Sequence, residues 1–297
     1  MTGVTLAAAM EEVATAIDQR FDLLLPVPDD ARADLYRAMR HAAIGGGKRL
    51  RPLLVHAAAD LFAVDRDCAG RAATALECIH VYSLIHDDLP AMDDDDLRRG
   101  KPTVHKAFDE ATAILAGDAL HALAFELMAD PATHPDPFVR AELVFDLARA
   151  AGPAGMAGGQ AMDLAADGTR FDLQTVTRLQ ALKTGALITA AVEAGAILGR
   201  VPPEGRTGLR GYAQDLGLAF QIADDLLDIE GDEALAGKKL RKDADAGKET
   251  FASLLGPERA REQCHILVDQ AIAHLHAYGP EADLLRAIAR YVVERDR

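Results

Sequence analysis

The sequence has no tryptophan and few other aromatic residues, and this scarcity bears on the fold class. Aromatic residues make up 5% of the 297 residues, whereas hydrophobic residues make up 49%, with many alanines and leucines among them. Strands favour aromatic and β-branched residues, whereas Ala and Leu favour helices. No stretch alternates between apolar and polar residues as a half-buried strand does. The composition therefore favours a helical protein with enough apolar residues for a large core.

Cysteine and positive charge are also in short supply. The three cysteines, Cys68, Cys78 and Cys264, form no CxxC pair and no metal-ligand spacing, which is typical of reduced thiols in the cytoplasm. The 47 acidic residues outnumber the 32 basic ones, so the formal net charge is -15. An excess of negative charge argues against a nucleic-acid surface. We therefore expect a cytoplasmic protein with no nucleic-acid partner.

Long hydrophobic runs are scarce as well. The first twenty residues lack a basic segment, so we expect no signal peptide. The longest apolar run, "TGALITAAVEAGAILG" at residues 184–199, contains Glu193 and is too short to span a membrane. We expect this run to form a buried helix in a soluble protein without a membrane span.

Apolar residues recur at helical spacing along nearly the whole chain, with interruptions at Gly and Pro. The connections between these segments are short, and no linker or repeat divides the chain. We therefore predict one all-α domain over residues 1–297, a single bundle of ten or more helices. The pattern predicts helices at residues 5–21, 29–43, 48–63, 67–87, 107–129, 137–150, 153–166, 172–199, 205–229, 249–254, 256–277 and 280–295.

The stretch "LIHDDLPAMDDDDLRRGKPT", at residues 84–103, places six aspartates within ten positions. It follows a predicted helix on which His80 and Asp87 share one face, and Pro90 ends that helix. The carboxylates therefore lie at the C-terminal end of a helix, where the macrodipole is already negative. Such a placement costs stability unless a cation binds. Taken alone, an acidic run is more often a solvated loop.

A second acidic segment, "GLAFQIADDLLDIEGD" at residues 217–232, favours a binding site. Gln221, Asp224 and Asp228 are spaced at i, i+3 and i+7, and most of the residues around them are apolar. A helix that is apolar nearly all round is buried, and buried carboxylates need cations or shared protons. We therefore expect these side chains to line an internal cavity rather than to face solvent.

The ligands in both acidic segments are oxygen atoms, which selects a hard cation. Magnesium takes one or two carboxylates and completes its coordination with water and substrate phosphate. The two segments therefore predict a magnesium-bound diphosphate. Several basic residues of the sequence could bind such a diphosphate. Each of them taken singly could have a purely structural role, as could the polar pair Gln160 and Asp163, but as a set the basic residues suit a diphosphate. These cations are Lys48, Arg51, Arg98, Arg99, Lys183, Lys238, Lys242 and Lys248.

Five motifs together resemble those of the trans-isoprenyl diphosphate synthases, in that family's order, and are closest to bacterial farnesyl diphosphate synthases. They are "GGGKRLRP", "HVYSLIHDDLPAMDDDDLRRGKPT", "GGQAMDL", "KTGALI" and "GLAFQIADDLLDIEGD". The resemblance implies an all-α homodimer, each subunit a helical bundle around a deep central cavity. It also implies head-to-tail 1'-4 condensation of an allylic diphosphate with isopentenyl diphosphate. One departure is Arg241, where family members often have a second glycine.

The resemblance also implies a role for each motif residue. Asp87 and Asp93 would bind two Mg²⁺ and Asp224 a third. The catalytic set would be Asp87, Asp88, Asp93, Arg98, Lys183, Asp224, Asp225 and Asp228. The allylic diphosphate would be held by Arg98, Lys183, Thr184, Gln221 and Lys238. Isopentenyl diphosphate would be held by Lys48, Arg51, His80 and Arg99.

The length of the product is expected to depend on the helix that precedes the first acidic segment. Tyr82 lies five residues before Asp87, about 7.5 Å along a helix, and Ser83 lies four before it. A ring at this distance would close the cavity after a short chain, and the resemblance agrees. We therefore expect a C15 product, farnesyl diphosphate, made from dimethylallyl or geranyl diphosphate.

Other functions stay open on the sequence alone. A geranylgeranyl diphosphate synthase would make a C20 product with the same machinery. A class I terpene cyclase would ionise a similar substrate, but Lys48, Arg51 and His80 would then have no common task. A non-catalytic partner subunit or acidic metal-binding protein is disfavoured because both acidic segments are intact and the second is set among apolar residues.

Overall fold

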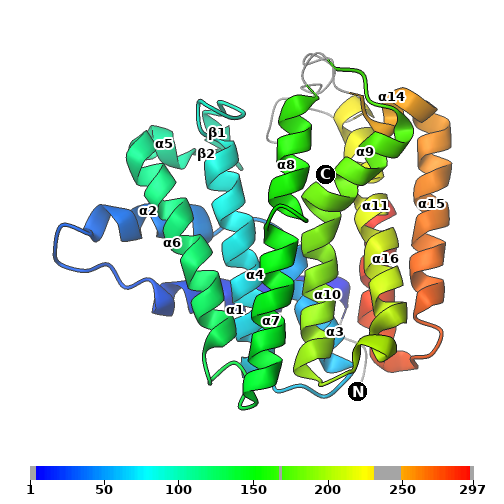
Figure 1. The fold of residues 1–297 in the computed structure, drawn as a ribbon, viewed down its shortest axis with the longest axis horizontal. Helices are drawn as coiled ribbons and strands as arrows, with labels where there is room; N and C mark the ends of the chain where they lie inside the picture. The colour runs from blue at the N-terminus through cyan, green and yellow to red at the C-terminus, as the bar shows by residue number, and fades with distance from the viewer. Residues whose placement is uncertain (1–4, 167–168, 231–248, 295–297) are drawn as a thin grey trace. The chain divides into compact units, whose positions relative to one another are not determined.

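The chain is almost entirely helical, as Figure 1 shows for the computed structural model, which describes residues 5–166, 169–230 and 249–294. The prediction of an all-α fold is confirmed. The chain forms two compact units, one from residues up to 56 together with 65–144, the other from 57–64 together with the chain beyond 144. The division falls within two helices, α3 (Leu50–Asp60) and α7 (Pro137–Ala151).

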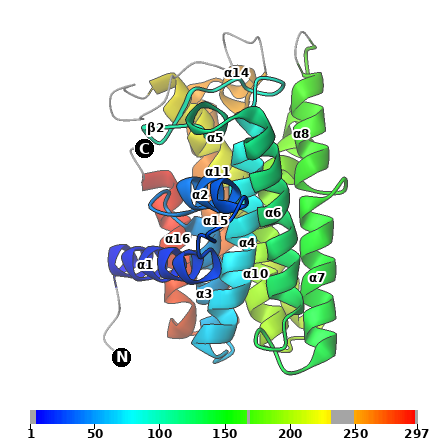
Figure 2. The same cartoon turned by 90° about the vertical axis from the view of Figure 1, so that its left-hand side faces the viewer.

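The first unit is centred on a long helix that packs against a second one. The elements of this unit besides the two shared helices are α1 (Leu6–Leu24), α2 (Ala33–Ala43), α4 (Arg66–Asp87), β1 (Leu97–Arg98), β2 (Lys101–Pro102), α5 (Val104–Ala107) and α6 (Glu110–Ala129). Helices α4 and α6 run side by side, and α1 and α2 both contact α4 (Figures 1 and 2). The core of the unit therefore lies around α4, which carries the first acidic segment at its end.

The start and the packing of α4 follow from its sequence. Asp65 caps the helix by accepting hydrogen bonds from the backbone N–H groups of Asp67 and Cys68. Many of its buried residues are small, so neighbouring helices approach closely. At Gly117 of α6 an added Cβ would lie 2.1 Å from Nε2 of His86, so a larger residue there would force the His86 ring to move. The same imidazole nitrogen lies 3.1 Å from the carbonyl oxygen of Ile114.

A two-stranded hairpin follows the acidic loop, and the sequence pattern did not predict it. Leu97 pairs with Pro102 and Arg98 with Lys101 in antiparallel register. The two turn residues, Arg99 and Gly100, have φ values of 52° and 75°, as a tight hairpin turn requires. Two residues in each strand are too few for an alternating pattern. The hairpin nevertheless decides where two basic side chains of the predicted site lie.

The second unit is built around one central helix. Besides the shared helices it contains α8 (Met156–Ala165), α9 (Leu173–Gln180), a π-helical segment (Ala181–Gly185), α10 (Ala186–Leu198), α11 (Thr207–Glu230), α14 (Phe251–Leu255), α15 (Pro257–His274) and α16 (Asp283–Glu294), with 3₁₀ turns at Pro203–Arg206 and Pro280–Ala282. Helix α11 packs against α10, α15 and α16 (Figure 1). The buried Tyr212 hydroxyl donates a 2.7 Å hydrogen bond to the Leu285 carbonyl and so ties α11 to α16.

One predicted helix begins later than expected, and another is interrupted. The predicted helix 107–129 corresponds to α6, which begins at Glu110 because Asp109 caps it by accepting a hydrogen bond from the backbone N–H of Thr112. The predicted helix 172–199 contains the π-helical segment between α9 and α10. A π-bulge widens the helix and is frequent at functional sites. Lys183 and Thr184, two predicted substrate residues, lie in it.

The apolar run at residues 184–199 forms a core helix, as predicted. Leu187, Ile188 and nearly every later side chain of α10 are buried. By length and composition alone, two helical stretches of the described chain, Glu110–Ala129 and Leu173–Leu198, are long and apolar enough to cross a membrane. In the second of these stretches 67% of the apolar window is buried by the protein itself, which is how a core helix behaves, against 39% in the first.

A close approach of two backbones in the second unit provides a test of this packing. A Cβ on Gly195 of α10 would lie 2.5 Å from the backbone nitrogen of Ala59, which cannot give way. We expect Gly195→Ala to lower the free energy of unfolding by about 1–3 kcal/mol through overpacking. Gly185→Ala is the control, because its Cβ would find nothing nearer than 3.6 Å. Urea denaturation of both variants is the measurement, and equal stability of the two would contradict this packing.

Candidate active site

The first acidic segment folds back onto the end of α4. The backbone N–H of Asp93 donates a 2.8 Å hydrogen bond to the carbonyl of Asp87, and that of Asp95 donates to Asp88 at 3.3 Å. Asp87 is the last residue of the helix and is half-buried, whereas Asp93 is exposed. The loop therefore brings together the backbones of the two residues that the sequence pairs as metal ligands in this unit.

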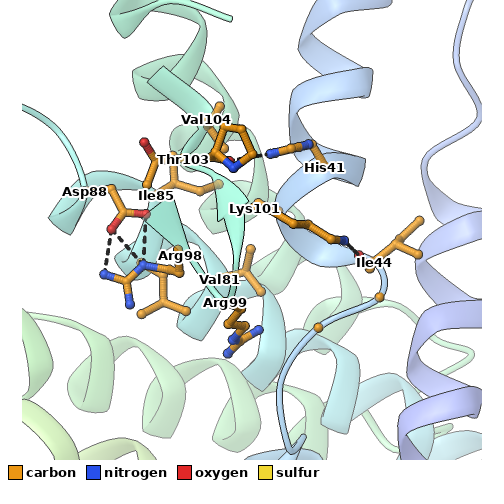
Figure 3. A pocket seen from close by; sticks show the side chains of 15 residues that line it. His41, Ile44, Val81, Ile85, Asp88, Arg98, Arg99, Lys101, Thr103 and Val104 are labelled. Carbon is orange, nitrogen blue, oxygen red and sulfur yellow. Dashed lines mark hydrogen bonds and ion pairs between the residues drawn. The ribbon is translucent and has the colours of Figure 1, made fainter. Parts of the chain in front are cut away.

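Asp88 has a different environment from its neighbours. Its side chain is 4% exposed and forms a bidentate pair with Arg98, with Nε of Arg98 2.7 and 2.9 Å from the two carboxylate oxygens and Nη2 2.6 Å from Oδ1 (Figure 3). Burial raises the pKa of Asp88, and the Arg98 guanidinium opposes that rise. Asp88 therefore anchors the hairpin arginine to the end of α4.

A glycine-rich loop between α2 and α3 lies against the hairpin. Gly45 and Gly47 have φ values of 76° and 82°, which favour glycine. A Cβ on Gly47 would lie 2.6 Å from the Arg99 guanidinium, so the loop backbone and this side chain touch. Figure 3 shows Arg99 beside the loop, and Lys101 directed at the carbonyl of Ile44, 3.5 Å from its Nζ. Two separate motifs of the sequence, the glycine-rich one and the first acidic one, thus meet at this point.

Arg51 and Arg99, with His80 beside them, form a cluster of basic residues whose charges alter one another's pKa values. Burial lowers the pKa of Arg51, which Arg99 lowers further and Glu77 opposes. Burial likewise lowers the pKa of Arg99 from its ordinary value. Both guanidinium groups remain protonated at neutral pH. Nε of Arg51 is buried without a hydrogen-bond partner, so one donor of the cluster is unsatisfied.

His80 lies on the same helix, two turns before Asp87. Burial, followed by the positive charges of Arg51, Arg99, Arg98 and Arg49, holds the pKa of His80 well below 6.5. The imidazole is therefore neutral at pH 7. A neutral imidazole among guanidinium groups acts as a hydrogen-bonding group rather than as a further cation.

Two charged residues near this cluster were not singled out by the sequence patterns. Arg49, in the glycine-rich motif, and Glu77, on α4, form a buried ion pair with Nη1 2.6 Å from Oε1. A buried Glu three residues before His80 on an apolar helix was the available signal. The rule that buried charges are paired would have prompted a search for its partner.

Tyr82, the predicted chain-length residue, packs against α6. Its ring meets that of His86 edge to face at 5.7 Å and that of His121 at 4.9 Å, and His121 in turn meets Phe125 at 5.2 Å. The side chain is half-buried, and burial raises its pKa. The Ser83 hydroxyl donates to the His80 carbonyl at 2.8 Å. The aromatic partners of Tyr82 on α6 were not predicted.

In the second unit, Lys183 is held by an aspartate of α8. Its Nζ lies 2.7 Å from Oδ2 of Asp163. A Cβ on Gly159 would lie 2.2 Å from the Lys183 backbone nitrogen, so only glycine lets α8 approach the π-helical segment this closely. The amide of Gln160 has both polar atoms buried without a partner. Gln160 and Asp163 are therefore not an ordinary polar pair, because Asp163 serves Lys183 and Gln160 has an unused donor and acceptor.

A chain of hydrogen bonds connects the other predicted residues of this unit. The Thr184 hydroxyl donates to Oε1 of Gln221 at 3.2 Å, and Nε2 of Gln221 donates to Asp225 at 3.1 Å. The second oxygen of Asp225 accepts the Phe251 N–H at 2.9 Å. Asp225 is buried and holds the start of α14. Asp224 and Asp228 are half-buried on α11, one helical turn apart.

The structure thus places the predicted residues in two groups, one in each unit. Lys48, exposed just before α3, and the carboxylates at the end of α4 belong to the first unit, whereas Lys183 and Asp224 belong to the second. Lys238, Arg241, Lys242 and Lys248 lie outside the described residues. Within the described chain, no three His, Cys, Asp or Glu side chains are close enough to hold a metal ion.

The donor set still fits magnesium. The candidate ligands are carboxylate oxygens, and the Asp87 carbonyl holds the Asp93 backbone in place. Magnesium needs only one or two protein carboxylates when a substrate supplies phosphate oxygens. A preformed cage of three side chains is therefore not required.

Comparison with known proteins shows which proteins the chain is similar to. The chain is 44% identical to a farnesyl diphosphate synthase of Escherichia coli strain K12, over 98% of both chains. It is also 44% identical to geranylgeranyl pyrophosphate synthase 11 of Arabidopsis thaliana, over 92% of this chain and 78% of that one. Among solved structures it resembles an FPP/GFPP synthase from Zymomonas mobilis, with 60% identity, a TM-score of 0.89, and 97% and 98% of the two chains covered.

The family assignment rests on the length of the match as well as on identity. The profile of the polyprenyl synthetase family matches residues 32–283, which include both acidic segments and the glycine-rich loop. A relative matched over nearly its full length belongs to the same class of enzymes that the sequence motifs resemble. The chain therefore belongs to the polyprenyl synthetase family.

Proposed function

We propose that this protein is a magnesium-dependent prenyltransferase that condenses an allylic diphosphate with isopentenyl diphosphate, head to tail, to give farnesyl diphosphate. The observation that carries the proposal is that the first acidic loop folds back onto the C-terminal end of α4. Asp93 is hydrogen-bonded to the Asp87 carbonyl, and the loop leads directly into the hairpin that carries Arg98 and Arg99. Relatives of nearly equal length are farnesyl diphosphate synthases, which supports the same activity.

The motifs that the chain shares with its family would hold the allylic diphosphate. Asp87, Asp93 and Asp224 would bind magnesium, three ions in all, which when bound would neutralise the departing pyrophosphate. Arg98 and Lys183 would grip the diphosphate oxygens. Asp88, Asp225 and Asp228 would keep these groups in place, because the first two already anchor Arg98 and α14. Lys238 would add a further cation, and Thr184 and Gln221 would face the substrate.

The reaction forms one carbon–carbon bond and breaks one carbon–oxygen bond. The allylic C–O bond ionises, and the isopentenyl double bond attacks the allylic cation that results. A proton then leaves the new chain, and the departing pyrophosphate accepts it, as is thought for this family. Lys48, Arg51, Arg99 and the neutral imidazole of His80 would hold isopentenyl diphosphate near that cation. Exclusion of water protects the cation until attack occurs.

Product length is proposed to depend on the rings around Tyr82. The chain grows away from the diphosphate and along α4, so a ring five residues before Asp87 lies in its path. The contacts with His86 and His121 hold that ring in one orientation. A farnesyl product fits this closure. Geranylgeranyl diphosphate is the second candidate product, since similar relatives make it.

A homodimer in the cytoplasm is part of the proposal. Helix α6 is apolar, yet Ile114 and Leu115 on it are 46% and 56% exposed, and Phe138 at the start of α7 is 84% exposed. Exposed large apolar side chains of this kind are covered when two subunits associate. None of the three cysteines forms a disulfide, as is usual in proteins of a reducing compartment.

The metal-binding role of the first acidic segment has a direct test. We expect Asp87→Asn to lower kcat by about 100-fold or more, because a neutral amide is a poor magnesium ligand. Asp94→Asn is the matched control in the same loop. Asp94 has φ 48°, a conformation that Asn accepts, so its variant should retain activity. The assay incubates the protein with magnesium, isopentenyl diphosphate and each allylic diphosphate, and EDTA should abolish turnover.

The same assay separates the rival functions. A terpene cyclase would consume an allylic diphosphate without isopentenyl diphosphate, and a metal-binding protein would consume neither. If the wild-type protein leaves isopentenyl diphosphate unchanged with every allylic partner, the proposed function is wrong.

Chain-length control can be tested at Tyr82. Tyr82→Ala removes the ring from the path of the growing chain, so products longer than C15 should appear. Tyr82→Phe keeps the ring and its edge-to-face contacts, so it should still make mainly C15. Chromatography of the dephosphorylated products measures the distribution. A purely C15 product from the alanine variant would show that the ring does not limit the chain.

The neutral state of His80 predicts a pH-dependent stability. The unfolded chain binds a proton at His80 below about pH 6.5, whereas the folded chain does not, because the folded pKa is lower. The contribution of His80 to the free energy of unfolding is therefore fully present above pH 6.5. It is lost as the pH falls below 6.5, by at most about 1.4 kcal/mol per pH unit. We expect the wild type to lose more stability than His80→Asn between pH 7 and 5.5 in urea titrations. Parallel pH profiles would contradict a neutral His80.

A further inference from the structure

The strongest polar network outside the proposed catalytic residues surrounds Arg49. The Arg49 side chain is 1% exposed and the Glu77 side chain 2%, and the two are 2.6 Å apart. Nη2 of Arg49 lies 2.6 Å from Oδ1 of Asp18 on α1, and it also donates to the carbonyl of Ala43 at the end of α2. The Phe21 ring lies 5.9 Å from the guanidinium carbon. One side chain thus connects α1, α2 and α4.

The same network holds both ends of the glycine-rich loop. Oδ2 of Asp18 accepts the Gly45 N–H at 3.0 Å, while its other oxygen binds Arg49. Between these points Gly47 has φ 82°, and Arg49 itself has φ 48°, which is unfavourable for a residue with a side chain. Such a conformation persists when surrounding contacts over-determine it. Asp18 and Glu77 supply those contacts.

The loop matters because of what it carries and touches. Lys48 precedes Arg49 directly, Arg51 follows two residues later, and the backbone of Gly47 packs against the Arg99 guanidinium. A shift of Arg49 would therefore move three of the four side chains assigned to isopentenyl diphosphate. The negative charge of Glu77 also raises the pKa values of Arg51 and Arg99, so it offsets the repulsion among these guanidinium groups.

Resting on the proposed function, we propose that Arg49, clamped by Glu77 and Asp18, is a positioning residue for the isopentenyl diphosphate subsite. It touches no substrate and acts through the glycine-rich loop. Asp18 lies outside residues 32–283, the range of the family match, so the clamp reaches beyond the shared motifs. A role in stability alone would not require charge, since apolar residues of similar size often replace a buried ion pair without loss.

The test uses a double variant that keeps the volume and removes the charges. Arg49→Met with Glu77→Leu is expected to fold with nearly unchanged thermal stability. Its KM for isopentenyl diphosphate should rise about tenfold or more, because a displaced loop misplaces the diphosphate ligands. The KM for the allylic diphosphate should change less than about threefold, as its main ligands lie elsewhere. An unchanged KM for isopentenyl diphosphate in this stable variant would overturn the proposal.

A milder pair of variants covers the case in which the double variant does not fold. Asp18→Ala removes the bridge between Gly45 and Arg49 from the partly exposed side. The control is Asp22→Ala, one turn along the same helix, whose side chain pairs with Arg40 instead of the loop. Only Asp18→Ala should raise the KM for isopentenyl diphosphate. Equal effects of the two variants would contradict the proposal, because they would show that Asp18 only stabilises α1.

A binding measurement separates the role of the Arg49 clamp from the proposed catalytic activity. Calorimetric titration of isopentenyl diphosphate alone reports the subsite without turnover. Weaker binding to Asp18→Ala than to wild type supports the clamp even if the product is not farnesyl diphosphate. A wild-type protein that binds isopentenyl diphosphate no better than Asp18→Ala would overturn the clamp, whereas a wild type that binds it without turnover would overturn the proposed function alone.

Discussion

Repulsion between like charges is the constraint on which this site depends. Six aspartates lie within ten positions at the end of α4, where the helix dipole adds negative charge. The chain reduces this repulsion by pairing selected carboxylates, Asp88 with Arg98 and Asp96 with Lys106. In the neighbouring guanidinium cluster the repulsion is between positive charges, and the negative charge of buried Glu77 reduces it. Acidic and basic groups thus stay near one another because each is balanced locally.

This crowding is possible only where the backbone can come close to a side chain. Gly47 faces the Arg99 guanidinium, Gly117 faces the His86 ring, and Gly159 faces the backbone of Lys183. In each case an added Cβ would lie under 3 Å from its neighbour. Glycine therefore lets a polar group reach its position without opening a gap that water would fill. The same close approaches explain why these motifs are rich in small residues.

Most of the fold was predictable because it follows from local periodicity. The helices were predicted within a few residues, since apolar spacing, Asp caps such as Asp65 and Pro or Gly breaks are all local signals. The π-helical segment was not, because it depends on α8 packing through Gly159. The hairpin was missed because its strands are two residues long and its turn is set by the positive φ of Arg99.

The sequence predicts which residues form the candidate site, but it does not predict which contacts these residues make. Spacing along α4 and α11 placed Asp87 and Asp224 on their helices, and composition suggested the basic partners. The sequence did not show that Asp88 and Asp225 are used to anchor Arg98 and α14, nor that Glu77 pairs with Arg49. Such pairings join residues far apart in the chain, so no local pattern contains them.

The ion pairs within each unit also bear on the choice of substrate. Lys183 is held by Asp163 and Arg98 by Asp88, so these long side chains are already ordered. Ordering such a side chain costs up to about 2 kcal/mol of conformational entropy. Because the side chain is ordered before a substrate binds, the binding free energy is not reduced by that cost. The partner carboxylates also compete with any incoming anion. A singly charged ligand gains little by replacing one carboxylate with another, whereas a diphosphate offers more charge and more acceptor oxygens to the same cations. Local pairing therefore favours a diphosphate over weaker anions in the surrounding solution.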